Sequence, residues 1–201
     1  MKKINLKELV QGKSAVFIDA ANILYSQQTL KWQVDYKKLA VYLQSIKPIF
    51  LGFYYGLIET NLKQAEFFAI LKDHGYSIRT KPIKYIKTPK GTILKGNLDI
   101  ELAFDVLKLA NSFDTCILFS GDSDFEVILK DLRRRQKRVI VLSTKGHVSI
   151  ELIRACDKYI DLKKLRKFLE REPKKFLPEG RKVYSPKTIT KYSKLVNKSK
   201  K

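Results

Sequence analysis

The chain has 201 residues and a net charge of +21, from 41 Lys or Arg and 20 Asp or Glu residues. A content of 44% hydrophobic and 11% aromatic residues excludes a wholly disordered basic chain, and the length favours one domain with an appendage. Uncharged runs are too short to cross a membrane, which takes about 20 apolar residues. The N-terminus also lacks the apolar core of a signal peptide. We therefore expect no membrane partner and a cytoplasmic location.

The positive charge is concentrated near the C-terminus. Residues 163–201 carry 15 Lys or Arg and 3 acidic residues, a net charge of +12 in under a fifth of the length. This predicts a folded domain over residues 1–162, followed by a basic helix to about Arg171 and a lysine-rich, partly disordered tail. A field of this sign attracts phosphate polyanions or anionic membrane surfaces, and the charge alone does not choose between them.

Apolar runs alternate with segments of helical period along the first 162 residues. We expect a loop after the first strand, which lies at residues 15–18. Residues 81–96, with their prolines, glycines and lysines, are also predicted to form a loop. Strands are predicted at residues 15–18, 49–55, 76–80, 115–119, 139–142 and 159–162. Helices are predicted at residues 36–43, 62–74, 98–111, 125–135 and 148–156. This alternation is typical of an α/β domain with a mostly parallel sheet covered on both faces.

Acidic residues follow two of the predicted strands. Asp19 comes directly after the strand at 15–18, and Asp122 and Asp124 follow the strand at 115–119. Sites in parallel α/β sheets form beyond the carboxyl ends of strands, so these carboxylates are candidates for a common site. An aspartate at such a position is also a common helix N-cap or turn residue, and that alternative stays open for each of them taken alone.

A third acidic element opens the helix at 98–111. Asp99 lies in its first turn, where a carboxylate also favours the helix dipole. Asp105 lies six residues further, roughly 240° around the helix, so the two cannot point at one spot; Asp99 is the better candidate and Asp105 a supporting one. Clustered carboxylates repel one another unless a cation balances them, and oxygen ligands suit Mg²⁺ or Mn²⁺.

Three motifs together resemble those of a known family. They are the segments 16–22 (VFIDAAN), 95–99 (KGNLD) with Asp105, and 119–125 (FSGDSDF). In this order they resemble the NYN domains, more closely their LabA/DUF88 branch, within the PIN-like nuclease superfamily, from about Ser14 to Leu162. The resemblance implies a PIN-like three-layer sandwich, with helices on both faces of a central five- or six-stranded sheet in the order 3-2-1-4-5.

The resemblance also implies an activity, namely cleavage of RNA that depends on Mg²⁺ or Mn²⁺. The family's acidic cluster matches four carboxylates of this chain, and its polar residue after the first acid matches Asn22. Ser120 matches the hydroxyl residue before the third acid and, with Asp105, would support the ligands from behind. The candidate metal ligands are Asp19, Asp99, Asp122 and Asp124, and the candidate catalytic residues are these four with Asn22.

Lysines around the predicted loop at 81–96 are candidates for binding RNA. Lys84, Lys87, Lys90 and Lys95 have the charge to follow a phosphate backbone, although a solvated loop has the same composition. Single-stranded RNA is the expected partner, and a homodimer is one expected assembly for a small α/β domain. The alternatives are a non-catalytic RNA-binding NYN module and a regulatory adaptor. A phosphatase is disfavoured because Ala21 stands where a second aspartate would follow Asp19.

Overall fold

The computed structural model describes residues 5–58, 61–88 and 91–172. The chain divides into two units, Met1–Arg171 and Glu172–Lys201. Every helix and strand that the structure describes belongs to the first unit. Residues 173–201, which contain the predicted lysine-rich tail, lie outside the described residues.

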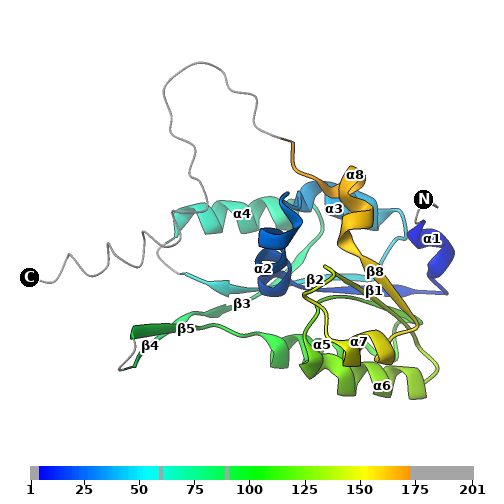
Figure 1. Cartoon of the computed structure of the whole chain (residues 1–201). Helices are drawn as coiled ribbons and strands as arrows, with labels where there is room; N and C mark the ends of the chain where they lie inside the picture. Colours follow the sequence, from blue (N-terminus) through cyan, green and yellow to red (C-terminus); the bar gives the residue numbers. More distant parts are fainter. Residues whose placement is uncertain (1–4, 59–60, 89–90, 173–201) are drawn as a thin grey trace, which may run out of the picture. The chain divides into compact units, whose positions relative to one another are not determined.

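The centre of the first unit is a sheet of six strands in the spatial order β3-β2-β1-β6-β7-β8 (Figure 1). All neighbouring strands are parallel. The strands are β1 (Ser14–Asp19), β2 (Phe50–Leu57), β3 (Ser77–Pro82), β6 (Thr115–Phe119), β7 (Arg138–Ser143) and β8 (Lys158–Asp161). Counted in chain order within this sheet, the order is 3-2-1-4-5-6. The predicted order is therefore confirmed, with a sixth strand added at the edge.

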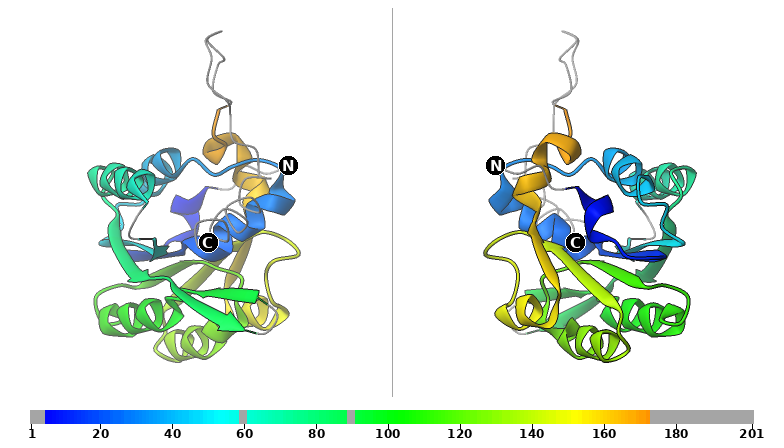
Figure 2. Two further views of the ribbon diagram at one scale, coloured as in Figure 1. Left: turned by 90° about the vertical axis from the view of Figure 1, so that its left-hand side faces the viewer. Right: turned by 90° about the vertical axis from the view of Figure 1, so that its right-hand side faces the viewer.

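Helices cover both faces of the sheet, so the predicted three layers are confirmed (Figure 2). Side chains of β1 alternate between two cores because successive residues of a strand point to opposite faces. Val16 and Ile18 belong to one core, and Ala15 and Phe17 to the other. The first core is covered by α1 (Leu6–Leu9), α2 (Ala20–Leu30), α3 (Tyr36–Gln44), α4 (Leu62–Asp73) and α8 (Arg166–Leu169). The second is covered by α5 (Asp99–Leu109), α6 (Glu126–Arg134) and α7 (Ile150–Ala155).

The segment predicted as a loop at 81–96 is in fact largely a β-hairpin, so that prediction was wrong. β3 continues to Pro82, and β4 (Lys84–Thr88) and β5 (Gly91–Lys95) form a separate antiparallel pair (Figure 1). The prolines and lysines suggested a loop, but Tyr, Ile and Thr alternate with them and favour extended backbone. Because β3 runs parallel to β1, the hairpin starts at the edge of the sheet where β1 ends.

The loop predicted after the first strand is also wrong, because α2 begins there without any connecting residue. Asp19 is both the last residue of β1 and the N-cap of α2, and its side chain accepts a hydrogen bond from the Asn22 amide. The helix ends at Lys31, which adopts a left-handed conformation with φ of 60°. Because Asp19 ends the strand and caps the helix at the same time, no loop is needed between them.

The start of the basic C-terminal segment packs on the first core. Leu165 and Leu169 are buried, and the rings of Tyr42 on α3 and Phe168 on α8 stack with centroids 5.6 Å apart. The boundary expected after Leu162 therefore falls inside the compact unit, which runs to Arg171. Among the described residues, no helix has the length and hydropathy to span a bilayer.

Candidate functional site

The predicted acidic residues meet at the carboxyl ends of β1 and β6, the two neighbouring strands at which the strand order reverses. After β1 the chain enters α2 on one face of the sheet, and after β6 it enters α6 on the other. This divergence leaves a cleft at the switch point, where ligand sites of parallel sheets form. The cleft has a volume of about 540 Å³, and its lining includes Asp19, Asn22, Tyr25, Tyr54, Asp99 and Asp122.

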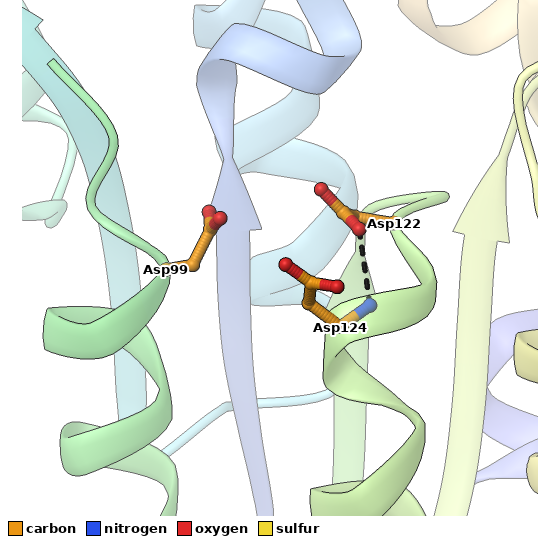
Figure 3. Close-up of side chains that lie close together, drawn as sticks. All are labelled: Asp99, Asp122 and Asp124. Carbon is orange, nitrogen blue, oxygen red and sulfur yellow. Dashed lines mark hydrogen bonds between the residues drawn. The ribbon is translucent and has the colours of Figure 1, made fainter. Parts of the chain in front are cut away.

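Three carboxylates come together at the edge of this cleft. Asp99, Asp122 and Asp124 each place one oxygen so that all three oxygens lie within 4.8 Å of one another. Figure 3 shows Asp99 reaching from the start of α5 toward Asp122 and Asp124, which come from the turn after β6. The Asp122 side chain accepts a hydrogen bond from the Asp124 amide at 3.0 Å. The sequence prediction that these residues share a site is consistent with this geometry.

The carboxylate of Asp99 is oriented by its neighbour Asn97. The Asn97 side-chain oxygen accepts a hydrogen bond from the Asp99 amide at 2.7 Å, and its side-chain nitrogen donates to the Asp99 carboxylate. In the sequence, Asn97 is recognised only as part of the motif at 95–99. Its role in orienting the Asp99 carboxylate depends on a side-chain conformation that no sequence pattern shows.

Asp19 is held between the two strand ends by hydrogen bonds. One carboxylate oxygen accepts from the Asn22 amide at 3.1 Å, and the other accepts from the Ser120 hydroxyl at 2.9 Å. The same Ser120 oxygen accepts from the Asp122 amide at 3.2 Å. Ser120, itself fully buried, thus connects the acid of β1 to the acid that follows β6.

Asn22 makes a second connection across the cleft. Its side-chain oxygen accepts a hydrogen bond from the Gly121 amide at 3.1 Å. A side chain at Gly121 would not fit, because its Cβ would lie 1.7 Å from the carbonyl oxygen of His147. Glycine is therefore required where the turn after β6 passes the loop between β7 and α7.

The electrostatics of the site show a group of carboxylates without a positive counterpart. Burial, and then the negative charges of Asp99 and Asp122, raise the pKa of Asp19 to about 6, against the lowering effect of its two hydrogen bonds. Burial and neighbouring carboxylates also raise the pKa of Asp99. Within the described residues no Lys or Arg forms an ion pair with any of the four acids.

A divalent cation fits this donor set. Several carboxylate oxygens lie close together, and no Lys or Arg of the described ranges pairs with them. This arrangement matches the oxygen coordination that Mg²⁺ and Mn²⁺ prefer. A cation bound here would favour the ionised form of Asp19, against the burial that raises its pKa.

Asp105 lies apart from this group, on another side of α5. It is buried, with 8% of its surface exposed, and its carboxylate accepts from the Tyr54 hydroxyl at 2.8 Å and from Arg79 Nε at 2.9 Å. Tyr54 lines the cleft. Asp105 therefore reaches the cleft through Tyr54 and does not join the three carboxylates.

The candidate RNA-binding lysines are on or beside the hairpin. Lys84 and Lys87 are exposed on β4, Lys95 is the last residue of β5, and Lys90 lies outside the described residues. From β5 the chain passes through Gly96 and Asn97 directly to Asp99. The hairpin is therefore attached to the rim of the cleft.

Tyr25 and Tyr54 also line the cleft but were missed in the sequence analysis. Tyr25 lies one helical turn after Asn22 on α2, so its position follows only once the helix is known to start at Ala20. Tyr54 is opposite Asp19 in the register of β2 and β1.

Comparison with known proteins identifies the class to which this fold and site belong. The model of the NYN domain family matches residues 13–163, so the chain belongs to the NYN domain family, within the PIN-like nuclease superfamily. The chain is 34% identical over 165 residues to the low amplitude and bright protein LabA of Synechococcus elongatus, covering 80% of this chain and 89% of LabA. This places it in the LabA branch, as the motifs had predicted.

A solved structure supports the fold. A crystal structure of a protein of unknown function from Vibrio parahaemolyticus superposes with a TM-score of 0.67 and 26% sequence identity. The match covers 79% of this chain and 96% of the Vibrio chain.

Proposed function

We propose that this protein is a metal-dependent ribonuclease that hydrolyses phosphodiester bonds of single-stranded RNA in the cleft at the ends of β1 and β6. The observation that carries the proposal is the meeting of three carboxylates within 4.8 Å, with Asp19 beside them and no described Lys or Arg paired to any of the four. Such a cluster in a chain of net charge +21 suits a cation at the centre and a polyanion around it.

The four aspartates, Asp19, Asp99, Asp122 and Asp124, would hold Mg²⁺ or Mn²⁺. When bound, a divalent cation lowers the pKa of water and neutralises negative charge that develops on a phosphate during displacement. The chain's own contribution is to hold the four carboxylates in place. Ser120 and Asn97 do so through the hydrogen bonds described above.

The remaining candidate residues have positioning and binding roles in this proposal. Asn22 keeps the ends of β1 and β6 together through its bond to the Gly121 amide, and its side-chain nitrogen has capacity to donate to a phosphate oxygen. Asp105 fixes Tyr54 in the wall of the cleft. The lysines of the hairpin would attract the RNA backbone as it leaves the cleft.

A cleavage assay tests the proposal. End-labelled single-stranded RNA and DNA of matched sequence are incubated with Mn²⁺, Mg²⁺ or EDTA. We expect cleavage of RNA only with the metals, and its loss in Asp19→Asn and Asp122→Asn. Asp35→Asn is the matched control, because Asp35 caps α3 in the same way but lies on no wall of the cleft.

The assay also separates the two alternatives. RNA binding without cleavage in the wild-type protein would favour a non-catalytic RNA-binding module, for which the caps made by Asp19 and Asp122 would be purely structural. Absence of both binding and cleavage would favour a regulatory adaptor. Cleavage that persists equally in both aspartate variants would contradict the proposed site.

A further inference from the structure

An exposed aromatic side chain stands in the wall of the acidic cleft. Tyr25 on α2 is 64% exposed, yet it lines the same cleft as Asp19, Asn22, Asp99 and Asp122. It lies three residues after Asn22, so the two side chains share one face of the helix. Neither core packing nor metal coordination accounts for this ring.

The Tyr25 ring contacts His147, which lies in the loop between β7 and α7. Its centroid lies 5.3 Å from that of His147, with the ring planes at 81°, an edge-to-face arrangement. His147 Nε2 lies 2.6 Å from the Thr29 hydroxyl, one turn further along α2. The histidine therefore orients Tyr25 and still leaves most of its surface open to solvent.

An open, oriented ring beside the proposed metal site has the chemistry of a base-stacking surface. Every nucleobase offers a π-face, and the bases of a single strand are free to leave their neighbours and stack on aromatic side chains. The bases of a duplex are already stacked within the helix. A ring at this place therefore favours unpaired nucleic acid over a duplex.

We propose that Tyr25 forms a nucleobase subsite, on which the base next to the phosphate at the proposed metal site stacks, with His147 as the positioning residue. This rests on the proposed function in that it requires nucleic acid to bind in the cleft. It adds a physical reason for a preference for unpaired nucleotides, and a contact that recognises the base and not the backbone.

Equilibrium binding tests the subsite. The probe is a fluorescently labelled single-stranded RNA in Ca²⁺, with its length checked by gel electrophoresis after each titration. We expect Tyr25→Ala to weaken binding about tenfold and Tyr25→Phe to stay within about twofold, because stacking needs the ring and not the hydroxyl. Phe104→Ala is the matched control: Phe104 is 62% exposed on α5 and does not line the cleft.

A set of RNAs with one abasic nucleotide at successive positions locates the stacked base. At one position the missing base should weaken wild-type binding by the same factor as Tyr25→Ala, and it should weaken the variant no further. Tyr25→Ala should bind a blunt RNA duplex as the wild-type protein does. A melting temperature within about 3 °C of wild type would exclude a folding defect, as expected for so exposed a side chain.

The two proposals fail separately. If Asp122→Asn abolishes cleavage but neither Tyr25→Ala nor any abasic position changes binding, the subsite is wrong and the ribonuclease stands. If the wild-type protein does not cleave RNA but the abasic effect appears and disappears with Tyr25, the ribonuclease is wrong and the subsite stands. An equal abasic effect in the wild-type protein and in Tyr25→Ala would overturn the subsite.

Discussion

The two ends of the parallel sheet carry opposite charges, and they differ in whether the charged groups have partners within the protein. At the carboxyl end, four aspartates gather without any cationic partner among the described residues. At the amino end lies a hollow of about 830 Å³, half of whose lining residues are basic, and these basic residues have local partners. Arg133 pairs with Asp157 at 2.9 Å, Lys137 donates to the Phe113 carbonyl at 2.8 Å, and Arg138 donates to the Leu9 carbonyl at 2.7 Å.

This contrast separates charge that supports the fold from charge that is available for a ligand. The hollow at the amino end is larger, but its charged groups are engaged with the protein itself. The cleft at the carboxyl end is smaller and holds carboxylates that repel one another. Burial, and then this repulsion, raise the pKa of Asp19. Substitutions of charged residues at the two ends should therefore have different effects: loss of activity at the carboxyl end and loss of stability at the amino end.

The largest effect is expected for Asp122→Asn. Removing one carboxylate from the group of three weakens cation binding and lowers the cleavage rate about 100-fold or more, because several kcal/mol of charge stabilisation is lost. Initial rates with Mn²⁺ and titration calorimetry with Mn²⁺ measure the two effects. Unchanged affinity for Mn²⁺ would remove Asp122 from the ligand set.

Gly121→Ala should come next, with a loss of about 1–3 kcal/mol in the free energy of unfolding. The new methyl group would lie 1.7 Å from the His147 carbonyl oxygen, so the loop between β7 and α7 must move. Urea denaturation measures the loss. Lys145→Ala, an exposed position in the same loop, is the control and should change stability little.

At the amino end, Asp157→Ala should destabilise the fold by about 1–2 kcal/mol. The Asp157 carboxylate pairs with Arg133 and accepts a hydrogen bond from the Val139 amide at 2.7 Å, and this amide would lose its partner. The cleavage rate of the folded variant should equal that of the wild-type protein. A lower cleavage rate in the fully folded variant would contradict the proposed difference between the two ends.

Asp19→Asn should increase stability by about 1 kcal/mol at pH 7 in EDTA and give no gain at pH 4. With a folded pKa of about 6 and a usual value of 3.8, the folded state keeps its proton between these pH values while the unfolded state releases it. Stability therefore falls as pH rises through this range, and asparagine removes that cost. Urea denaturation at both pH values provides the test. If Asp19→Asn lost the same free energy of unfolding at each pH, the hydrogen bonds of Asp19 would outweigh the cost of its charge.

The smallest effect is expected for Lys87→Ala on the hairpin. Loss of one exposed lysine should weaken RNA binding about two- to threefold for all sequences alike and lower the salt slope by about one counterion. Lys130→Ala is the matched control, because Lys130 lies at the amino end and pairs with Glu126 at 2.7 Å. An equal effect of both substitutions would assign the binding to overall charge.

The strand order was predicted from the family resemblance and is confirmed, whereas the meeting of the acids was expected from local patterns. A buried strand ending in Asp19 and another ending before Asp122 must bring their acids to one edge when the strands are parallel neighbours. Asp105 was correctly expected to point away from Asp99, since six helical residues turn the side chain to another face.

Other features depend on information that the sequence pattern does not hold. The hairpin was missed because its lysines and prolines resemble a loop and its strands pair only with each other. α2 was missed because its strand connects to it without a turn, and with it the position of Tyr25. The role of Asn97 depends on a side-chain rotamer.

The bridges made by Ser120 and Asn22 have a consequence for folding kinetics. The Ser120 bond to Asp19 joins residues 101 positions apart, and the Asn22 bond to Gly121 joins residues 99 apart. Contacts between such distant residues form only after a long loop has closed, which is slow compared with helix formation. During refolding, the proposed cleavage activity should thus return after the helical signal, at the time when β1 pairs with β6.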